Sequence, residues 1–228
     1  MIKILFILLI FFIPNGALGH LKHYENIKEI QMDIFKDGKI IGFCNYEFFR
    51  DGDNTEIKNN TEFNVELLNI KIFSIISNST EVYNKNNLIS FKSKTLQNKK
   101  KKYVNLKYLK EDNKFLIDGS SYKGTSSIDI VIGSWWNHKI LTANKQISPL
   151  SGSVKDQTIT FIKKENISIN GKKILSHKFS LKSKDPNLSD DKKLDFEIWL
   201  EPKKNIILKV SYNRLGNWEY ILKDIILD

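Results

Sequence analysis

The alternation of apolar and polar residues at every second position is the feature that most constrains this chain. In the run from Thr61 to Leu67, for example, Phe63, Val65 and Leu67 share one face, and the residues between them are polar. Such a period is typical of strands that keep one face in water. Segments of this kind, bounded by turn residues, recur to the end of the chain and predict about eleven strands with at most one or two short helices. The expected fold class is all-β.

Short turns are the commonest connections in the predicted sheet. The strongest hairpin signal is Asp37-Gly38, which stands between a strand at Ile30 to Ile34 and a return strand at Ile40 to Phe48. Short turns make neighbouring strands antiparallel. The segment Ile70 to Ile76 is apolar on both faces, so it is either a central strand covered on both sides or a short buried helix; its isoleucine-rich composition favours the strand.

The apolar face of this sheet carries more large side chains than a flat sheet can leave in water. They are Phe48, Phe63, Tyr108, Phe161, Phe179, Phe196, Trp218 and Tyr220. A long, strongly curved antiparallel sheet, in the form of a half-barrel or an incomplete barrel, would enclose them. We expect a short segment containing Trp135 and Trp136 to plug its concave side.

The segment Gly133 to His138 interrupts the alternation with two adjacent tryptophans. A buried indole N–H needs a hydrogen-bond partner, so such a pair belongs between apolar packing and a polar rim. Two interpretations are open: a plug that fills one end of the core, or a lid over a bound ligand. On the second interpretation the candidate ligand-binding residues are Trp135, Trp136, Asn137, His138, Phe63, Tyr108, Phe161 and Phe196.

The first 19 residues have the pattern of a signal peptide. Lys3 precedes the apolar run Ile4 to Ile13, and Ala17-Leu18-Gly19 resembles a cleavage site. The expected organisation is a signal peptide at 1–19 and a single β domain at 20–228. Cys44, the one cysteine, is far from this site and is not a lipid acceptor. The expected location is the periplasm or the extracellular space.

The chain is basic, with a net charge of +10 that comes almost entirely from lysine. Only two of its 36 basic residues are arginine, the residue favoured for bidentate binding of phosphate, so we expect no nucleic-acid partner. The run Lys99 to Lys102 belongs at a hairpin tip. It is either a solvated tip or a contact with the phosphate headgroups of a membrane surface.

No motif in the sequence indicates catalysis. The chain lacks a nucleophile elbow, a zinc-binding His-Glu-x-x-His helix, a phosphate loop and a dinucleotide fingerprint. We therefore expect a protein without a cofactor or a metal site, and not an enzyme. Should it be one, His138 is the best candidate for a polar group at the mouth of a cavity.

The order of short motifs resembles an uncharacterised family of bacterial secreted proteins known as a domain of unknown function. The motifs are Asp37 to Gly42, Glu81 to Tyr83, Trp135 to Asn137, Ser151-Gly152, Ile198 to Leu200 and Arg214 to Tyr220. The resemblance implies an all-β fold and no catalytic residues. At the level of the fold, the expected curved sheet is also similar to periplasmic half-barrels that carry lipids and lipoproteins.

Our leading hypothesis is a monomeric, non-enzymatic periplasmic protein whose curved sheet binds an apolar ligand or lipid. The excess of aromatic side chains on one face motivates it. The alternative is a structural or assembly partner of the cell envelope with a solid core, which docks another protein through a sheet edge or the tryptophan segment.

Overall fold

The computed structural model describes residues 20–68, 70–189 and 192–228, so the predicted signal peptide lies outside the described residues. Eight strands form the first half of the sheet: β1 (Ile27–Lys36), β2 (Lys39–Asp51), β3 (Asn54–Leu67), β4 (Ile70–Asn84), β5 (Asn87–Gln97), β6 (Lys100–Leu109), β7 (Lys114–Gly119) and β8 (Lys123–Ser127). The second half contains β9 (Val131–Ile132), β10 (Lys145–Ile147), β11 (Val154–Ile169), β12 (Lys172–Ser183), β13 (Asp195–Glu201), β14 (Ile206–Asn213) and β15 (Asn217–Leu227). Two short 3₁₀ helices are η1 (His20–Tyr24) and η2 (His138–Leu141).

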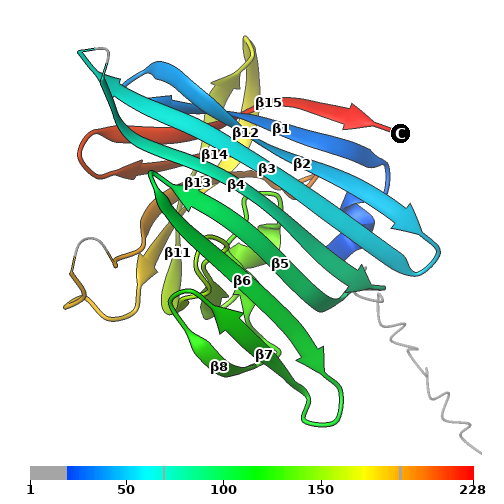
Figure 1. Cartoon of the computed structure of the whole chain (residues 1–228). Helices are drawn as coiled ribbons and strands as arrows, with labels where there is room; N and C mark the ends of the chain where they lie inside the picture. Colours follow the sequence, from blue (N-terminus) through cyan, green and yellow to red (C-terminus); the bar gives the residue numbers. More distant parts are fainter. Residues whose placement is uncertain (1–19, 69, 190–191) are drawn as a thin grey trace, which may run out of the picture.

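The described strands form one curved sheet that does not close into a barrel (Figure 1). From one edge to the other, the strands follow in descending order from β8 to β1 and then from β15 to β9. The two halves join where β1 pairs antiparallel with β15, with Ile34 opposite Tyr220. Apart from the short parallel pair of β9 and β10, the paired strands are antiparallel. The predicted all-β incomplete barrel is confirmed.

The predicted hairpin at Asp37-Gly38 is confirmed. Asp37 and Gly38 have φ of 49° and 77°, both in the left-handed region that matches the twist of the flanking strands. The same end of the sheet carries the β3–β4, β5–β6 and β14–β15 turns, because antiparallel neighbours reverse at alternate ends. Figure 1 shows these turns on the left of the view. We call this end of the sheet the rim.

Residues 128–153, which we call the plug, cover the concave face of the sheet (Figure 1). The plug contributes to three buried clusters. Trp136 packs with the central strands, Ile130, Ile132 and Ile147 pack with β5–β7, and Ile140 and Leu141 pack with β12–β14. The plug therefore replaces the missing wall of a closed barrel as the cover of the core.

One local prediction is wrong. Ile70 to Ile76 is a strand, but it is not covered on both faces: Ile70 is 66% exposed and Ile72 is also exposed, because this end of the β3–β4 hairpin extends past its neighbours. The short edge strand β8 pairs with β7. Of the predicted lysine tip, Lys99 lies in the β5–β6 turn and Lys100 already begins β6.

Candidate functional site

Trp136 fixes the plug to the first half of the sheet. Its indole is 1% exposed and packs edge-on against Tyr24, Phe48 and Tyr83, with ring centroids 5.1, 5.5 and 5.9 Å away. Indole Nε1 donates a hydrogen bond of 2.9 Å to Glu81 Oε1. Both requirements of a buried tryptophan, apolar packing and a partner for its N–H, are met at this one point.

Glu81 is the buried carboxyl that receives this bond. It projects from β4, and its second oxygen, Oε2, accepts a bond of 2.7 Å from the Tyr83 hydroxyl. Burial raises the pKa of Glu81, while the hydrogen bonds that it accepts, first from Trp136 and then from Tyr83, oppose part of that rise. One oxygen of the carboxyl thus holds the plug through Trp136, and the other is bonded to Tyr83 on the same strand.

His138 lies next to this cluster at the start of η2. Its Nδ1 is 2.8 Å from the Tyr24 hydroxyl, and its backbone N–H donates to the same oxygen at 3.2 Å. Burial, with smaller contributions from the charges of His23 and Lys139, lowers the pKa of His138 to about 4. The ring is therefore neutral at neutral pH and joins η2 to η1.

Two further residues shape the plug around the tryptophans. A Cβ at Gly133 would overlap Gln146 Oε1, so a larger residue would displace the buried Gln146 side chain where the chain passes β10. Asn137 caps η2, since its Oδ1 accepts a bond of 3.0 Å from the Lys139 backbone N–H. These local constraints explain why the segment Gly133 to His138 departs from the strand pattern.

Trp135 faces the opposite half of the sheet from Trp136. Its backbone N–H donates to the Tyr46 hydroxyl at 3.0 Å. Its ring lies 5.2 Å from Phe196 on β13 and 6.0 Å from Tyr220 on β15, measured between centroids. The two adjacent indoles therefore connect the plug to both halves of the sheet.

A cavity of about 340 Å³ lies beside Trp135, between the plug and the concave face; we call it the central cavity. This volume falls within the range of small-molecule pockets. Seven aromatic side chains line it, together with aliphatic residues from both halves and the plug. The aromatic residues are Tyr46, Phe63, Phe73, Trp135, Phe196, Tyr212 and Tyr220.

The central cavity has a polar floor. Ser77 and Thr95 share a hydrogen bond of 2.7 Å between their hydroxyls, and Thr61 Oγ1 is 3.1 Å from Cys44 Sγ. Burial raises the pKa of the Cys44 thiol, so at neutral pH it is a small neutral core group. These bonds satisfy the hydroxyls of Thr61, Ser77 and Thr95 within the protein itself.

The mouth of the central cavity is basic. Lys155, Lys193 and Arg214 are part of its lining. Arg214 and Lys193 are exposed and lie at the rim, in the β14–β15 turn and in the segment before β13. Cations therefore lie at the opening of the cavity, and aromatic rings lie below them.

The predicted ligand-binding residues lie in different places. Phe63, Trp135 and Phe196 meet around the central cavity. Trp136 does not line this cavity but is buried against Glu81, and His138 is bonded to Tyr24. The tryptophan pair is thus split, with one ring in the core and the other at the cavity wall.

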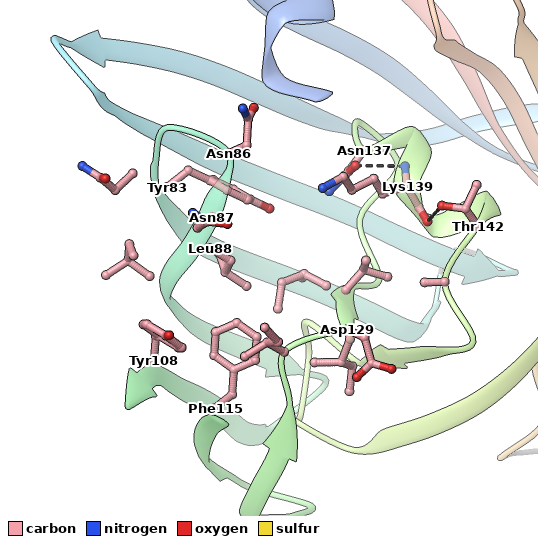
Figure 2. A pocket seen from close by; sticks show the side chains of 17 residues that line it. Tyr83, Asn86, Asn87, Leu88, Tyr108, Phe115, Asp129, Asn137, Lys139 and Thr142 are labelled. Atoms are coloured by element: carbon pink, nitrogen blue, oxygen red, sulfur yellow. Dashed lines mark hydrogen bonds between the residues drawn. The ribbon is translucent and has the colours of Figure 1, made fainter. Parts of the chain in front are cut away.

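Tyr108 and Asn137 line a second pocket, of about 430 Å³, on the far side of the plug. Figure 2 shows Tyr83, Leu88, Tyr108 and Phe115 on one wall and Asp129, Asn137, Lys139 and Thr142 on the other. Asparagines 84, 86 and 87 also line it. Its walls are more polar than those of the central cavity, and apart from the plug residues it is lined by β4 to β7 and the β4–β5 turn.

Phe161 lies at neither of these sites. It is 49% exposed and packs against Phe179 and His177 on the β11–β12 hairpin. A register shift between Phe161 and Lys163 disrupts the alternation at this point, and the plug does not cover the ring. Phe161 instead lines a separate hollow of about 590 Å³, together with Phe179 and the plug residue Leu141.

Sequence reasoning missed Glu81 as a central residue of the site. Glu81 lies on the same face of β4 as Ile75, Ser77, Ser79 and Tyr83. A carboxyl among residues that face the core was the signal that could have identified it. Phe73, Tyr46 and Tyr212 were also missed as lining residues. The part of the chain that the structure describes contains no cluster of three or more histidine, cysteine or acidic side chains arranged to hold a metal.

Neither helix within residues 20–68, 70–189 and 192–228 has the length and apolar run of a membrane-spanning segment. Residues 32–223 match the family described as Domain of unknown function (DUF6134). A search of curated proteins found no match.

Two solved structures are similar to this chain. One is the beta-barrel-like protein of Domain of Unknown Function DUF1849 from Brucella abortus, with 11% identity, a TM-score of 0.61, and coverage of 89% of this chain and 98% of that one. The other is a protein with a YmcC-like fold from Bacteroides fragilis, with 10% identity, a TM-score of 0.36, and coverage of 87% and 94%. The first supports the fold alone.

Proposed function

The chain belongs to the DUF6134 family, a domain of unknown function with a beta-barrel-like fold, and within that fold we propose that the central cavity binds an amphipathic ligand, such as a lipid with an acyl chain. The protein acts by binding, not by catalysis. It works in the periplasm or outside the cell, as the signal-peptide pattern of residues 1–19 predicts.

The aromatic lining of the central cavity is the observation that carries this proposal. Phe63 and Phe73 from the first half, Phe196 and Tyr220 from the second, and Trp135 from the plug surround one open space. Some of these rings pack against one another, since the centroids of Phe63 and Phe73 are 5.9 Å apart and those of Trp135 and Phe196 are 5.2 Å apart. An open space of about 340 Å³ nevertheless remains beside them, and this volume is in the range of small-molecule sites.

The charge at the mouth supports an anionic head on the ligand. Lys193 and Arg214 are exposed there, and the chain as a whole carries a net charge of +10. Such a field attracts anions to the opening. The chain of the ligand would then pass between Phe63, Phe73 and Phe196 below.

The polar groups near the cavity support binding over catalysis. Glu81 uses its two oxygens to hold Trp136 and Tyr83, and His138 is bonded to Tyr24 and lies outside the central cavity. A general base needs hydrogen-bond reach to the reacting group. These two titratable groups serve the attachment of the plug.

The proposal is tested with cis-parinaric acid, a fluorescent fatty acid that accepts energy from nearby tryptophan. We expect saturable, one-to-one binding with quenching of Trp135, whose ring borders the cavity. The blocking variant is Ser79→Phe, because Ser79 lines the cavity and a phenyl ring would fill it. The matched control is Thr80→Phe, which places the same ring on the outer face of β4.

Binding by the wild type and by Thr80→Phe, with loss of at least about tenfold in Ser79→Phe, is the expected result. Equal binding by both variants would place the probe elsewhere and contradict the proposal. A folded wild type that binds no probe would contradict the proposal and favour the alternative, a protein with a solid core that docks another protein.

A further inference from the structure

Two leucines at the rim have a backbone conformation that leucine rarely adopts. Leu68 in the β3–β4 turn has φ of 50° and Leu215 in the β14–β15 turn has φ of 51°. Asparagine, aspartate and glycine tolerate this region best, and most other positive-φ positions in the described chain hold them, as at Asn98, Asn170 and Asn205. Leucine at such a position costs backbone strain.

The same two leucines are nearly fully exposed. Leu68 is 87% and Leu215 is 90% exposed, so no packing within the chain offsets the strain. Ile40, Ile70 and Ile72 are also exposed at the rim. Single exposed apolar residues are ordinary, whereas apolar residues on three turns of one end form a patch that calls for a partner.

Basic residues surround these apolar tips. The four rim turns, at 36–39, 66–71, 96–101 and 214–217, contain seven lysines and arginines against two acidic residues, Asp37 and Glu66. The connection before β13, residues 184–194, adds three lysines and three aspartates. Asp37 is joined to Lys36 by an ion pair of 2.6 Å. Lys71, Lys99 and Lys100 are exposed. Leucine and isoleucine flanked by lysine is the chemistry of a surface that enters the headgroup region of a membrane.

The rim is also where the central cavity opens. Arg214 lines the cavity and immediately precedes Leu215, and Phe73 lines it one residue beyond Ile72. The β14–β15 turn and the rim end of the β3–β4 hairpin, which both carry exposed apolar residues, therefore border the cavity. A bilayer in contact with the tips would face that opening.

We propose that the rim docks on the surface of a bilayer that contains anionic phospholipid. Leu68 and Leu215 enter the boundary between headgroups and acyl chains, and the rim lysines contact lipid phosphates. Docking places the cavity mouth against the membrane, where a lipid can enter or leave. The purpose of docking rests on the proposed function, whereas docking itself rests on the rim alone.

The test is co-sedimentation of the full chain with vesicles of phosphatidylcholine alone and with vesicles of phosphatidylcholine and phosphatidylglycerol in equal amounts. We expect binding to the second kind only, weakened by added salt. The double variant Leu68→Asn, Leu215→Asn should bind at least about tenfold more weakly, because each leucine loses apolar burial on insertion. Asparagine suits both turns, so this variant keeps the fold.

Two control variants separate docking from general surface effects. Leu116→Asn with Leu175→Asn removes two exposed leucines that are outside the rim, and it should bind as the wild type does. Lys71→Gln, Lys99→Gln and Lys100→Gln should weaken binding to the anionic vesicles. The same lysine-to-glutamine substitutions at Lys172, Lys173 and Lys203, at the opposite end of the sheet, should weaken binding to the anionic vesicles less.

The outcomes are distinct from those of the ligand experiment. The docking variant should still bind cis-parinaric acid in solution, and Ser79→Phe should still bind vesicles. A wild type that ignores anionic vesicles, or a double leucine variant that binds them unchanged, would overturn the inference. So would a dimer, seen by sedimentation velocity, that the leucine substitutions abolish, because the rim would then bind a second copy of the chain.

Discussion

Replacing Trp136 with phenylalanine tests how the plug is held. The substitution keeps a ring among Tyr24, Phe48 and Tyr83 but removes the N–H that donates to Glu81 at 2.9 Å. A lost hydrogen bond to a buried carboxyl costs about 1–3 kcal/mol, and the smaller ring adds about 1 kcal/mol of lost packing. We expect the free energy of unfolding to fall by about 2–4 kcal/mol.

The assay is urea unfolding followed by far-ultraviolet circular dichroism, because tryptophan fluorescence changes with the substitution itself. A double-mutant cycle with Glu81→Met isolates the pair, and the coupling energy should be about 1–3 kcal/mol with unchanged m-values. Trp135→Phe is the control, since its backbone N–H, which the substitution keeps, makes the bond to Tyr46. A coupling below about 0.5 kcal/mol would refute this account of the plug.

Four further predictions concern stability. Burial raises the pKa of Glu81 above its usual 4.5. The protonated form therefore contributes stability at low pH, and this contribution should be lost as the pH rises from 4.5 through the raised pKa. In Glu81→Gln, the free energy of unfolding measured in urea should change less over this pH range. The pKa of His138 is lowered from 6.5 to about 4, so the free energy of unfolding should fall as the pH drops from 6.5 to 4. The loss should be about 1–2 kcal/mol, because the ring is partly exposed to solvent. His138→Gln should not show this loss. Gly133→Ala should lower the thermal midpoint, since the new Cβ displaces Gln146, at a cost of about 1–3 kcal/mol. Leu215→Asn alone should raise the thermal midpoint, because it relieves a positive φ at an exposed turn.

The architecture was largely predictable because its signals are local. The hairpin at Asp37-Gly38 and the alternation of β3 depend on nearest neighbours in the chain, and the aromatic excess on one face required a curved, covered sheet. The short motifs also indicated the correct kind of family, which the match over residues 32–223 confirms.

The details of the site depended on contacts between distant residues. Whether Trp135 or Trp136 borders the cavity is decided by which half of the sheet each indole reaches, and β1 meets β15 across almost the whole chain. Phe161 kept the inward-facing period in the sequence, but a register shift in β11 left it exposed. The exposed isoleucines of β4 have the composition of a core strand, so only the paired neighbours show that they extend past the sheet.

The most direct test of ligand binding is native mass spectrometry of the protein, expressed from the full sequence of 228 residues and purified without detergent, followed by organic extraction. The account predicts a discrete added mass on the wild type and on Thr80→Phe that extraction removes and identifies as a lipid, and its absence from folded Ser79→Phe. A wild type that carries no added mass, and gains none after incubation with phosphatidylglycerol vesicles, would contradict the claim that the central cavity is a lipid site.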